Sequence, residues 1–182
     1  MAKCRNTGFT LIEMLVTVTI VAILAALAAP NFRTLIVSTT LTSQANEFLT
    51  MMAYARSEAV KRNARVTLCK SSSGTACATS GNWEQGYIVF TDWASGGTVG
   101  TVDAGDTVLK VHATLSSGST LVGSTRLVSY VSFLSNGQST QAGRWDLCGA
   151  VTTVAGRDLT LSAGTGMPVV TKDEVPTVCD GT

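Results

Sequence analysis

Cysteine is the residue type with the most evident chemistry in this sequence of 182 residues, which contains five. Cys4 has no apolar run before it, so it does not fit a lipid-anchor site. The other four form an even set, and in an oxidising compartment such a set forms two disulfides, for which three pairings exist. These four are Cys69, Cys77, Cys148 and Cys179.

We favour a pairing of Cys69 with Cys77, which closes a loop rich in serine and glycine, and of Cys148 with Cys179, which ties down the C-terminal tail. The spacing alone leaves all three pairings open. Zinc binding is the alternative use of these thiols, but the sequence has no C-x-x-C pair and only one histidine. We therefore expect disulfides, and neither a metal site nor a cofactor.

The single histidine, His112, is the other candidate for catalysis. It falls in a predicted strand on the same face as Lys110, and we expect that face to be solvated. A nucleophilic site would need a free thiol or an elbow such as G-x-S-x-G, and the sequence shows neither. Asp103 and Asp106 flank a glycine turn without the alternating acids of a calcium loop. We therefore expect no enzymatic activity.

Glu13 is the one charged residue inside a long apolar run, Phe9–Ala29. As a helix these 21 residues would be about 32 Å long, enough to cross the hydrocarbon core of a bilayer. Lys3 and Arg5 precede the run, so the positive-inside rule places the N-terminus in the cytoplasm and the rest of the chain outside. A carboxylate at this depth costs roughly 2 to 4 kcal/mol unless it finds a partner.

Two processing schemes fit this N-terminus. A secretory signal would use Lys3 and Arg5 as its basic region and end at Ala26-Leu27-Ala28, which would release a soluble protein that begins at Ala29. A disposable signal has no use for Glu13, however. The carboxylate therefore favours a segment that stays on the mature chain.

The run Gly8-Phe9-Thr10-Leu11-Ile12-Glu13-Met14-Leu15 resembles the processing signature of type IV prepilins and type II secretion pseudopilins. The resemblance implies that a prepilin peptidase cuts between Gly8 and Phe9 and that the new terminus, Phe9, is N-methylated. It also implies that Glu13 pairs with the Phe9 amine of a neighbouring subunit, so that the buried charge selects register rather than adding stability. Pro30 stands where major pilins carry a helix-bending proline.

Beyond this run the apolar residues keep a helical spacing. They follow each other at intervals of 4, 3, 4, 3 and 4 residues, which is the stripe of an amphipathic helix. One helix from Phe9 to Asn63 would be about 80 Å long, and Pro30 would bend it because proline lacks the amide donor. The stripe consists of Leu41, Ala45, Phe48, Met52, Ala55 and Ala59.

After residue 65 the pattern changes to alternation, with turns rich in glycine and serine between short β-forming runs. Asn136-Gly137 is a strong hairpin signal. The sequence therefore predicts an α+β fold in which the amphipathic half of the helix packs on antiparallel sheet. We expect Trp83, Trp93 and Trp145 in this packing, or alternatively in a binding platform. The predicted strands are 66–69, 87–91, 107–113, 127–134, 145–147 and 159–162.

The resemblance continues past the N-terminus. The helix run 54–60, the strand that follows it, and the later runs 86–90, 108–112 and 133–137 resemble the FimT/FimU minor pilins and the GspH pseudopilin of type II secretion. The resemblance implies a pilin-like fold and a low-abundance subunit that joins a minor-pilin complex, primes assembly and ends near the filament tip. The implied partners are the prepilin peptidase, other minor pilins, the major pilin, the inner-membrane assembly platform and the membrane.

The charge distribution bears on DNA, which FimT-like members bind through a basic Gly-Arg-x-Arg motif near the C-terminus. Here Gly156-Arg157-Asp158-Leu159 has an acid and an apolar residue after its arginine. The 13 basic and 12 acidic side chains give a net charge of +1, and the part from Ser71 on carries only 5 basic against 9 acidic residues. DNA binding is therefore possible but not favoured, with Arg62, Arg65 and Arg157 as the candidate contacts.

We therefore predict a structural minor pilin of the FimU type, with a FimT-like DNA-binding pilin and a GspH-like secretion pseudopilin as the alternatives. Residues 1–8 would be the leader, 9–30 the transmembrane and filament-core half of the helix, and 31–182 the periplasmic globular domain. The chain would cross the inner membrane once before assembly. Afterwards it would belong to an extracellular pilus or a periplasmic pseudopilus.

Overall fold

The computed structural model describes residues 8–93, 97–116, 118–151, 153–162, 164 and 166–172, without the side chains of residues 27–31. The described chain contains one long α-helix, a 3-10 turn, η1 (Trp83–Gln85), and eight β-strands. It divides into two compact units, Met1–Ile36 and Val37–Thr182. All eight strands belong to the second unit.

The long helix, α1 (Leu11–Arg62), agrees with the predicted helix to within two residues at each end. It passes through position 30, but the side chain of Pro30 lies outside the description, so the predicted bend there stays a prediction. At the other end Asn63 adopts a left-handed conformation with φ of 51°. The Ala64 N–H then donates to the Ala59 carbonyl at 3.2 Å, which closes the helix with a Schellman-type cap.

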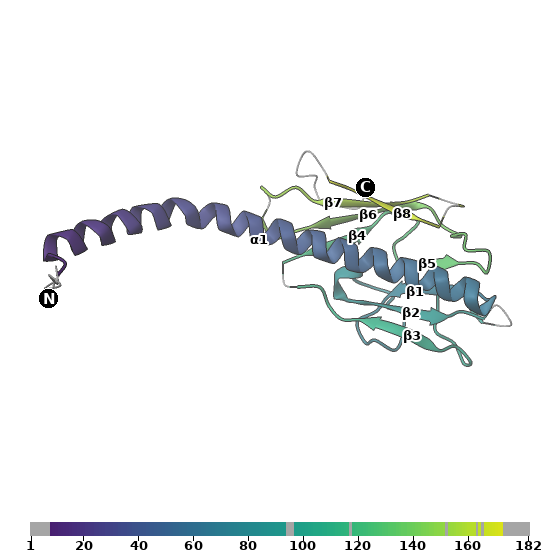
Figure 1. The fold of residues 1–182 in the computed structure, drawn as a ribbon. Helices are drawn as coiled ribbons and strands as arrows, with labels where there is room; N and C mark the ends of the chain where they lie inside the picture. Colours follow the sequence, from purple (N-terminus) through teal and green to yellow (C-terminus); the bar gives the residue numbers. More distant parts are fainter. Residues whose placement is uncertain are drawn as a thin grey trace, which may run out of the picture. The chain divides into compact units, whose positions relative to one another are not determined.

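The predicted apolar stripe of α1 is confirmed as the helical part of the core. Each of its six residues is at most 1% exposed. The second half of α1, from Val37 on, lies over both sheets of its unit (Figure 1), and the buried side chains of that half belong to one cluster with apolar residues from both sheets. The 4-3-4-3-4 spacing therefore follows from a helix that buries one face and leaves the other to its surroundings.

The first sheet is antiparallel, with the strand order β3-β2-β1-β5. Its central strands β1 and β2 are buried along their whole length, because α1 covers one face and a smaller apolar cluster around Cys69, Ile88 and Phe90 covers the other. Its strands are β1 (Val66–Lys70), β2 (Tyr87–Thr91), β3 (Val108–His112) and β5 (Tyr130–Phe133).

The second sheet is also antiparallel, with the order β4-β6-β7-β8. Sequence analysis predicted one antiparallel sheet and missed both edge strands of this one, β4 and β8. Asn136-Gly137 does reverse the chain, with Gly137 at φ of 78°, but the next strand, β6, joins the second sheet instead of pairing with β5. The strands are β4 (Thr120–Gly123), β6 (Gly143–Cys148), β7 (Arg157–Leu161) and β8 (Pro168–Lys172).

An aromatic cluster joins helix and sheets at the centre of the core. The Phe48 ring meets the rings of Trp83, Tyr87 and Trp145 edge to face, at centroid distances of 5.6, 5.0 and 5.2 Å. Trp83 also donates its indole N–H to the Leu127 carbonyl at 2.8 Å. The predicted pilin-like α+β fold, a long N-terminal helix followed by antiparallel sheet, is confirmed.

Candidate assembly and processing site

The predicted cleavage bond, Gly8–Phe9, lies just before the first turn of α1. Phe9 is 78% exposed, and no described residue lies within 4 Å of the position that a Cβ atom on Gly8 would take. Because these two residues precede the hydrogen-bonded helix, a peptidase could reach the bond without first unwinding it. The structure thus leaves the predicted processing bond accessible.

Thr10 begins the helix, which sequence analysis did not anticipate. Its hydroxyl accepts the Glu13 N–H at 3.3 Å, which satisfies one of the amides that every helix leaves free at its first turn. The signal was present in the sequence as Thr10-x-x-Glu13, a spacing typical of helix N-termini. The backbone N–H of Glu13 is therefore bound by the helix cap, while its carboxylate is exposed in the first turn.

The other polar groups of the N-terminal segment are satisfied within the helix. The Thr17 hydroxyl donates to the Met14 carbonyl at 2.9 Å, and the Thr19 hydroxyl donates to the Val16 carbonyl at 2.8 Å. These threonines therefore need no outside partner. Glu13 is the remaining polar side chain between Leu11 and Ala26, and it carries the only charge there.

The apolar side chains of this segment point outward around the whole helix. Every described residue from position 8 to position 26 is exposed, so the segment is unlike an amphipathic surface helix, which buries one stripe. An apolar surface of this size marks a contact with other molecules. Its large members are Phe9, Leu11, Ile12, Met14, Leu15, Val16, Val18, Ile20, Val21, Ile23 and Leu24.

A membrane crossing is a separate question from this exposure. Within the part of the chain that the structure describes, no helix meets the length and apolarity needed to span a bilayer. The predicted single pass through the inner membrane is therefore not confirmed.

The cysteines that the structure describes, Cys69, Cys77 and Cys148, belong to the second unit. Cys69 and Cys77 form a disulfide with an S–S distance of 2.03 Å, which is one of the pairings that the sequence left open. Cys148 is disulfide-bonded too, but its favoured partner, Cys179, lies outside the described residues. Beside the first disulfide, Lys70 is buried and donates to the Gly81 carbonyl at 2.7 Å, and burial lowers the pKa of its ammonium group.

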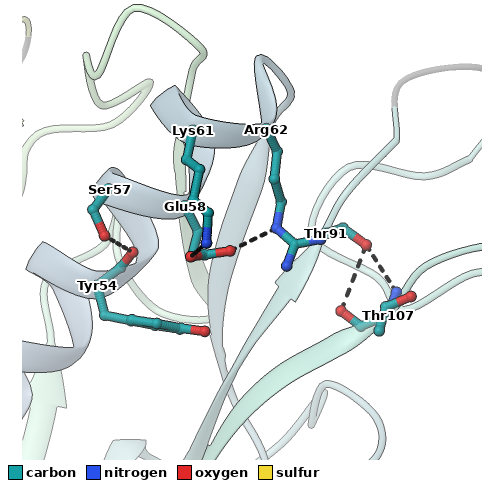
Figure 2. Close-up of polar contacts among 7 residues, drawn as sticks. All are labelled: Tyr54, Ser57, Glu58, Lys61, Arg62, Thr91 and Thr107. Carbon is teal, nitrogen blue, oxygen red and sulfur yellow. Dashed lines mark hydrogen bonds and ion pairs between the residues drawn. The ribbon is translucent and has the colours of Figure 1, made fainter.

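The basic end of α1 contains two of the three candidate DNA contacts. Arg62 donates to Glu58 at 2.6 Å, and Lys61 contacts the same carboxylate at 3.3 Å (Figure 2). The Arg62 hydrogen bond is the main cause that lowers the pKa of Glu58, and burial opposes it. Arg65 has two guanidinium nitrogens that are buried and make no hydrogen bond within the described part of the chain. Much of this positive charge is thus neutralised or covered.

The third candidate contact, Arg157, was predicted wrongly. Its residue is only 7% exposed, and its guanidinium donates to the Ala155 carbonyl at 2.8 Å and to the hydroxyls of Ser38 and Thr42 at 3.2 and 3.1 Å. Arg157 therefore fastens β7 to α1 and does not face a phosphate backbone. The prediction failed because sequence does not show that the second half of α1 covers this arginine.

The face of β3 that we predicted to be solvated carries Lys110, which is exposed, and His112, which is half-buried. The His112 ring stacks on Tyr87 at a centroid distance of 4.4 Å, and Nε2 lies 3.2 Å from a Glu47 carboxylate oxygen. Lys110 faces the helix as well, with its ammonium 5.3 Å from the centre of the Tyr54 ring. Both residues make these contacts because α1 packs against this edge of the first sheet. Burial, and then the Glu47 charge, raises the pKa of Tyr87 far above its ordinary value.

The remaining candidate residues are the three tryptophans and the aspartates of the glycine turn. Trp83 and Trp145 are fully buried in the core, whereas Trp93 is exposed. Asp106 accepts the N–H groups of Asp103 and Trp93 at 2.9 and 3.1 Å, which is turn chemistry. Among the described residues no group of three or more His, Cys, Asp or Glu side chains could hold a metal ion.

Two protein-family models match this chain, one within each unit. The family described as Type II transport protein GspH matches residues 44–165, and the Prokaryotic N-terminal methylation motif matches residues 3–29. No curated protein sequence matches. The fold is similar to two crystal forms of the type IV minor pilin FimU from Pseudomonas aeruginosa strain PAO1, with TM-scores of 0.54 and 0.51 at 21% and 20% identity. These matches cover 75% of this chain, and 95% and 99% of the FimU chains.

The GspH match covers more than half of the chain and coincides with the helix stripe and the sheets that hold the core. The methylation motif coincides with the exposed apolar segment and with the predicted processing bond. The chain therefore belongs to the GspH family, within the FimT/FimU/GspH group of type IV minor pilins and type II secretion pseudopilins.

Proposed function

We propose that this chain is a minor pilin of a type IV pilus that enters a priming complex at the filament tip. Prepilin peptidase cuts between Gly8 and Phe9 and methylates the new amine of Phe9. The observation that carries the proposal is the first unit, a helix with exposed apolar side chains all round and one carboxylate. Such a helix gains its burial from other subunits, since its own chain offers it little apolar surface.

Glu13 then acts in recruitment. In a bundle of apolar helices, its carboxylate is the one charge that must find a partner, and the processed Phe9 amine of a neighbouring subunit is the complementary charge. Because an unpaired charge in such surroundings costs several kcal/mol, only registers that join the two are populated. The threonine hydroxyls, already bonded within the helix, do not compete for this role.

Before assembly, the proposal places the apolar run in the inner membrane and the second unit in the periplasm. The length and composition of Phe9–Ala29 support this placement. The disulfide between Cys69 and Cys77 also fits an oxidising compartment.

A pseudopilin of type II secretion is the second candidate, and the description of the matching family favours it. Both candidates require the same processing and the same helix bundle. They differ in the filament that contains the chain and in whether secreted proteins stall when the gene is deleted.

The test is to replace Glu13 with alanine and to measure the chain in sheared surface pili. We expect strongly reduced piliation or loss of the chain from the pili, with the second unit still folded. Glu13→Gln is the control that keeps shape and removes charge, and it should behave like alanine. Normal incorporation of both variants would exclude the proposed role of Glu13. The intact mass of the wild-type chain from the same pili should correspond to a methylated N-terminus at Phe9, whereas a start at Ala29 would indicate a secretory signal.

A further inference from the structure

One edge of the first sheet is incompletely covered. Strand β5 is the last strand in the order β3-β2-β1-β5, so only β1 pairs with it inside the sheet. Lys70 donates its N–H to the Ser129 carbonyl at 3.1 Å, and Cys69 lies opposite Tyr130. In an antiparallel ladder, bonded and non-bonded pairs alternate, so the N–H and C=O groups of Tyr130 and Ser132 point away from β1.

The chain that returns after β5 covers Ser132 but not Tyr130. The Ser132 N–H donates to the Gln141 side chain at 3.0 Å, and the Ser132 carbonyl accepts the Thr140 N–H at 2.9 Å. The same register would next pair Tyr130 with Ala142. Among the described residues no hydrogen bond joins these two, because the strands separate here as the chain leaves for β6 in the second sheet. The backbone groups of Tyr130 are thus left at an open edge.

A hollow of 470 Å³ lies at this point, where the edges of the two sheets diverge. Its lining includes Tyr130 of β5 and three residues of the returning chain, Thr140, Gln141 and Ala142. Arg126 is the only charged residue of the lining, it is exposed, and its guanidinium has no partner among the described residues. Within the described part of the chain, the hollow therefore offers the backbone N–H and C=O of Tyr130 and the unpaired guanidinium of Arg126.

We infer that this hollow is a docking site for an extended peptide segment of a partner protein that carries an aspartate or glutamate. Extended peptides add to sheet edges through main-chain hydrogen bonds, and an open edge is a ready template for them. One residue of the partner would exchange two hydrogen bonds with Tyr130. A carboxylate beside that residue would then pair with Arg126 and fix the direction of the segment.

The site lies wholly in the second unit, so the inference does not depend on the assembly role proposed for Glu13. The probe is a short blocked peptide of alternating threonine and valine with one central aspartate. We would titrate it into the isotope-labelled full chain in detergent micelles and follow backbone amide signals by NMR. We expect the signals of Tyr130 and Ala142 to shift. The same peptide with asparagine in place of aspartate should bind about two- to five-fold more weakly, the range expected for an exposed ion pair.

Two variants assign the effect to this site. Arg126→Ala should weaken the aspartate peptide to the level of the asparagine peptide and leave the asparagine peptide unchanged. Lys172→Ala, which removes an exposed cation from the edge strand β8 of the other sheet, should have no effect. A short oligothymidylate is the competing probe, because phosphates also bind arginine.

The inference is overturned if Tyr130 does not shift, if the aspartate and asparagine peptides bind equally, or if Lys172→Ala weakens binding as much as Arg126→Ala. It is also overturned if the oligothymidylate shifts the same signals at lower concentration than the peptide. The folded state of each variant is checked by the fluorescence of the buried tryptophans, Trp83 and Trp145.

Discussion

The two units of this chain use apolar residues in opposite ways. In the unit Met1–Ile36 the helix exposes them, and Phe32 is 65% accessible. In the unit Val37–Thr182 the same helix collects them on one stripe, and Phe48 is 1% accessible. The second unit buries its apolar residues in a core of its own, whereas the described apolar side chains of the first unit are exposed. The arrangement of apolar residues, more than their number, separates a folding surface from an assembly surface.

The sharpest test of this comparison removes the same side chain from each unit. Phe48→Ala deletes the ring that meets Trp83, Tyr87 and Trp145, and we expect it to lower the free energy of unfolding of the second unit by about 3 to 5 kcal/mol. Phe32→Ala should leave that free energy unchanged within about 0.5 kcal/mol. Urea unfolding of the full chain in micelles, followed by tryptophan fluorescence, reports the second unit because all three tryptophans lie there.

Equal destabilisation by the two alanine variants would show that the units share one core, and the comparison would fail. If Phe32→Ala lowers the incorporation of the chain into filaments while leaving its unfolding unchanged, the assignment of the first unit to assembly is strengthened. Phe48→Ala would lower incorporation too, but only together with the loss of folded protein.

A second pair of substitutions compares one arginine from each unit, and its expected effect on stability is smaller. Arg157→Met removes a buried guanidinium that donates to Ser38, Thr42 and two carbonyls, and should cost about 2 kcal/mol, since hydrogen bonds from charged groups contribute the most. Arg33→Met, at an exposed position in the first unit, should change stability by less than about 0.5 kcal/mol. The same urea titration measures both. A duplex DNA shift assay run alongside should show no loss of binding that is specific to Arg157→Met.

Much of the fold could be predicted because its signals are local. The stripe of α1 has a helical period, and six of the eight strands lie in alternating runs bounded by glycine turns. The edge strands β4 and β8 were missed because each has an adjacent Val or Leu pair without a clear alternating pattern, and β8 begins with a proline. The division into two sheets depends on where β5 and β6 find their partners, and this is long-range pairing that no local pattern encodes.

The candidate site divides in the same way. The processing and assembly roles of Gly8, Phe9 and Glu13 stay predictions, which the sequence allows because they depend on spacing along one segment, the segment that the methylation motif matches. The surroundings of Arg157 and His112 could not be predicted, because their partners on α1, Ser38 and Glu47, lie 119 and 65 residues away along the chain. Sequence analysis expected a solvated face for His112 and named Arg157 as a candidate DNA contact, whereas both side chains contact α1. The exposure of a charged or polar residue in a strand thus cannot be predicted until the element that packs on that strand is known.

The smallest expected effect is on the pH dependence of stability. It is tested by replacing one glutamate in each unit, Glu58 and Glu13. Hydrogen bonding from Arg62 holds the pKa of Glu58 below its ordinary value, so in the folded chain the carboxylate stays ionised to lower pH than in the unfolded chain. Its contribution to stability is therefore present above the unfolded pKa of about 4.3 and is lost as the pH falls through the lowered folded value.

Glu58→Gln should lower the urea midpoint slightly at neutral pH and match wild type in acid. Glu13→Gln, in the first unit, should match wild type at every pH, because the Glu13 side chain is exposed and makes no hydrogen bond or ion pair with another described residue. A pH-dependent gap for Glu13→Gln in monomeric micelles would mean that the first unit has an internal partner, and would weaken the contrast between a unit that folds alone and one that waits for its neighbours.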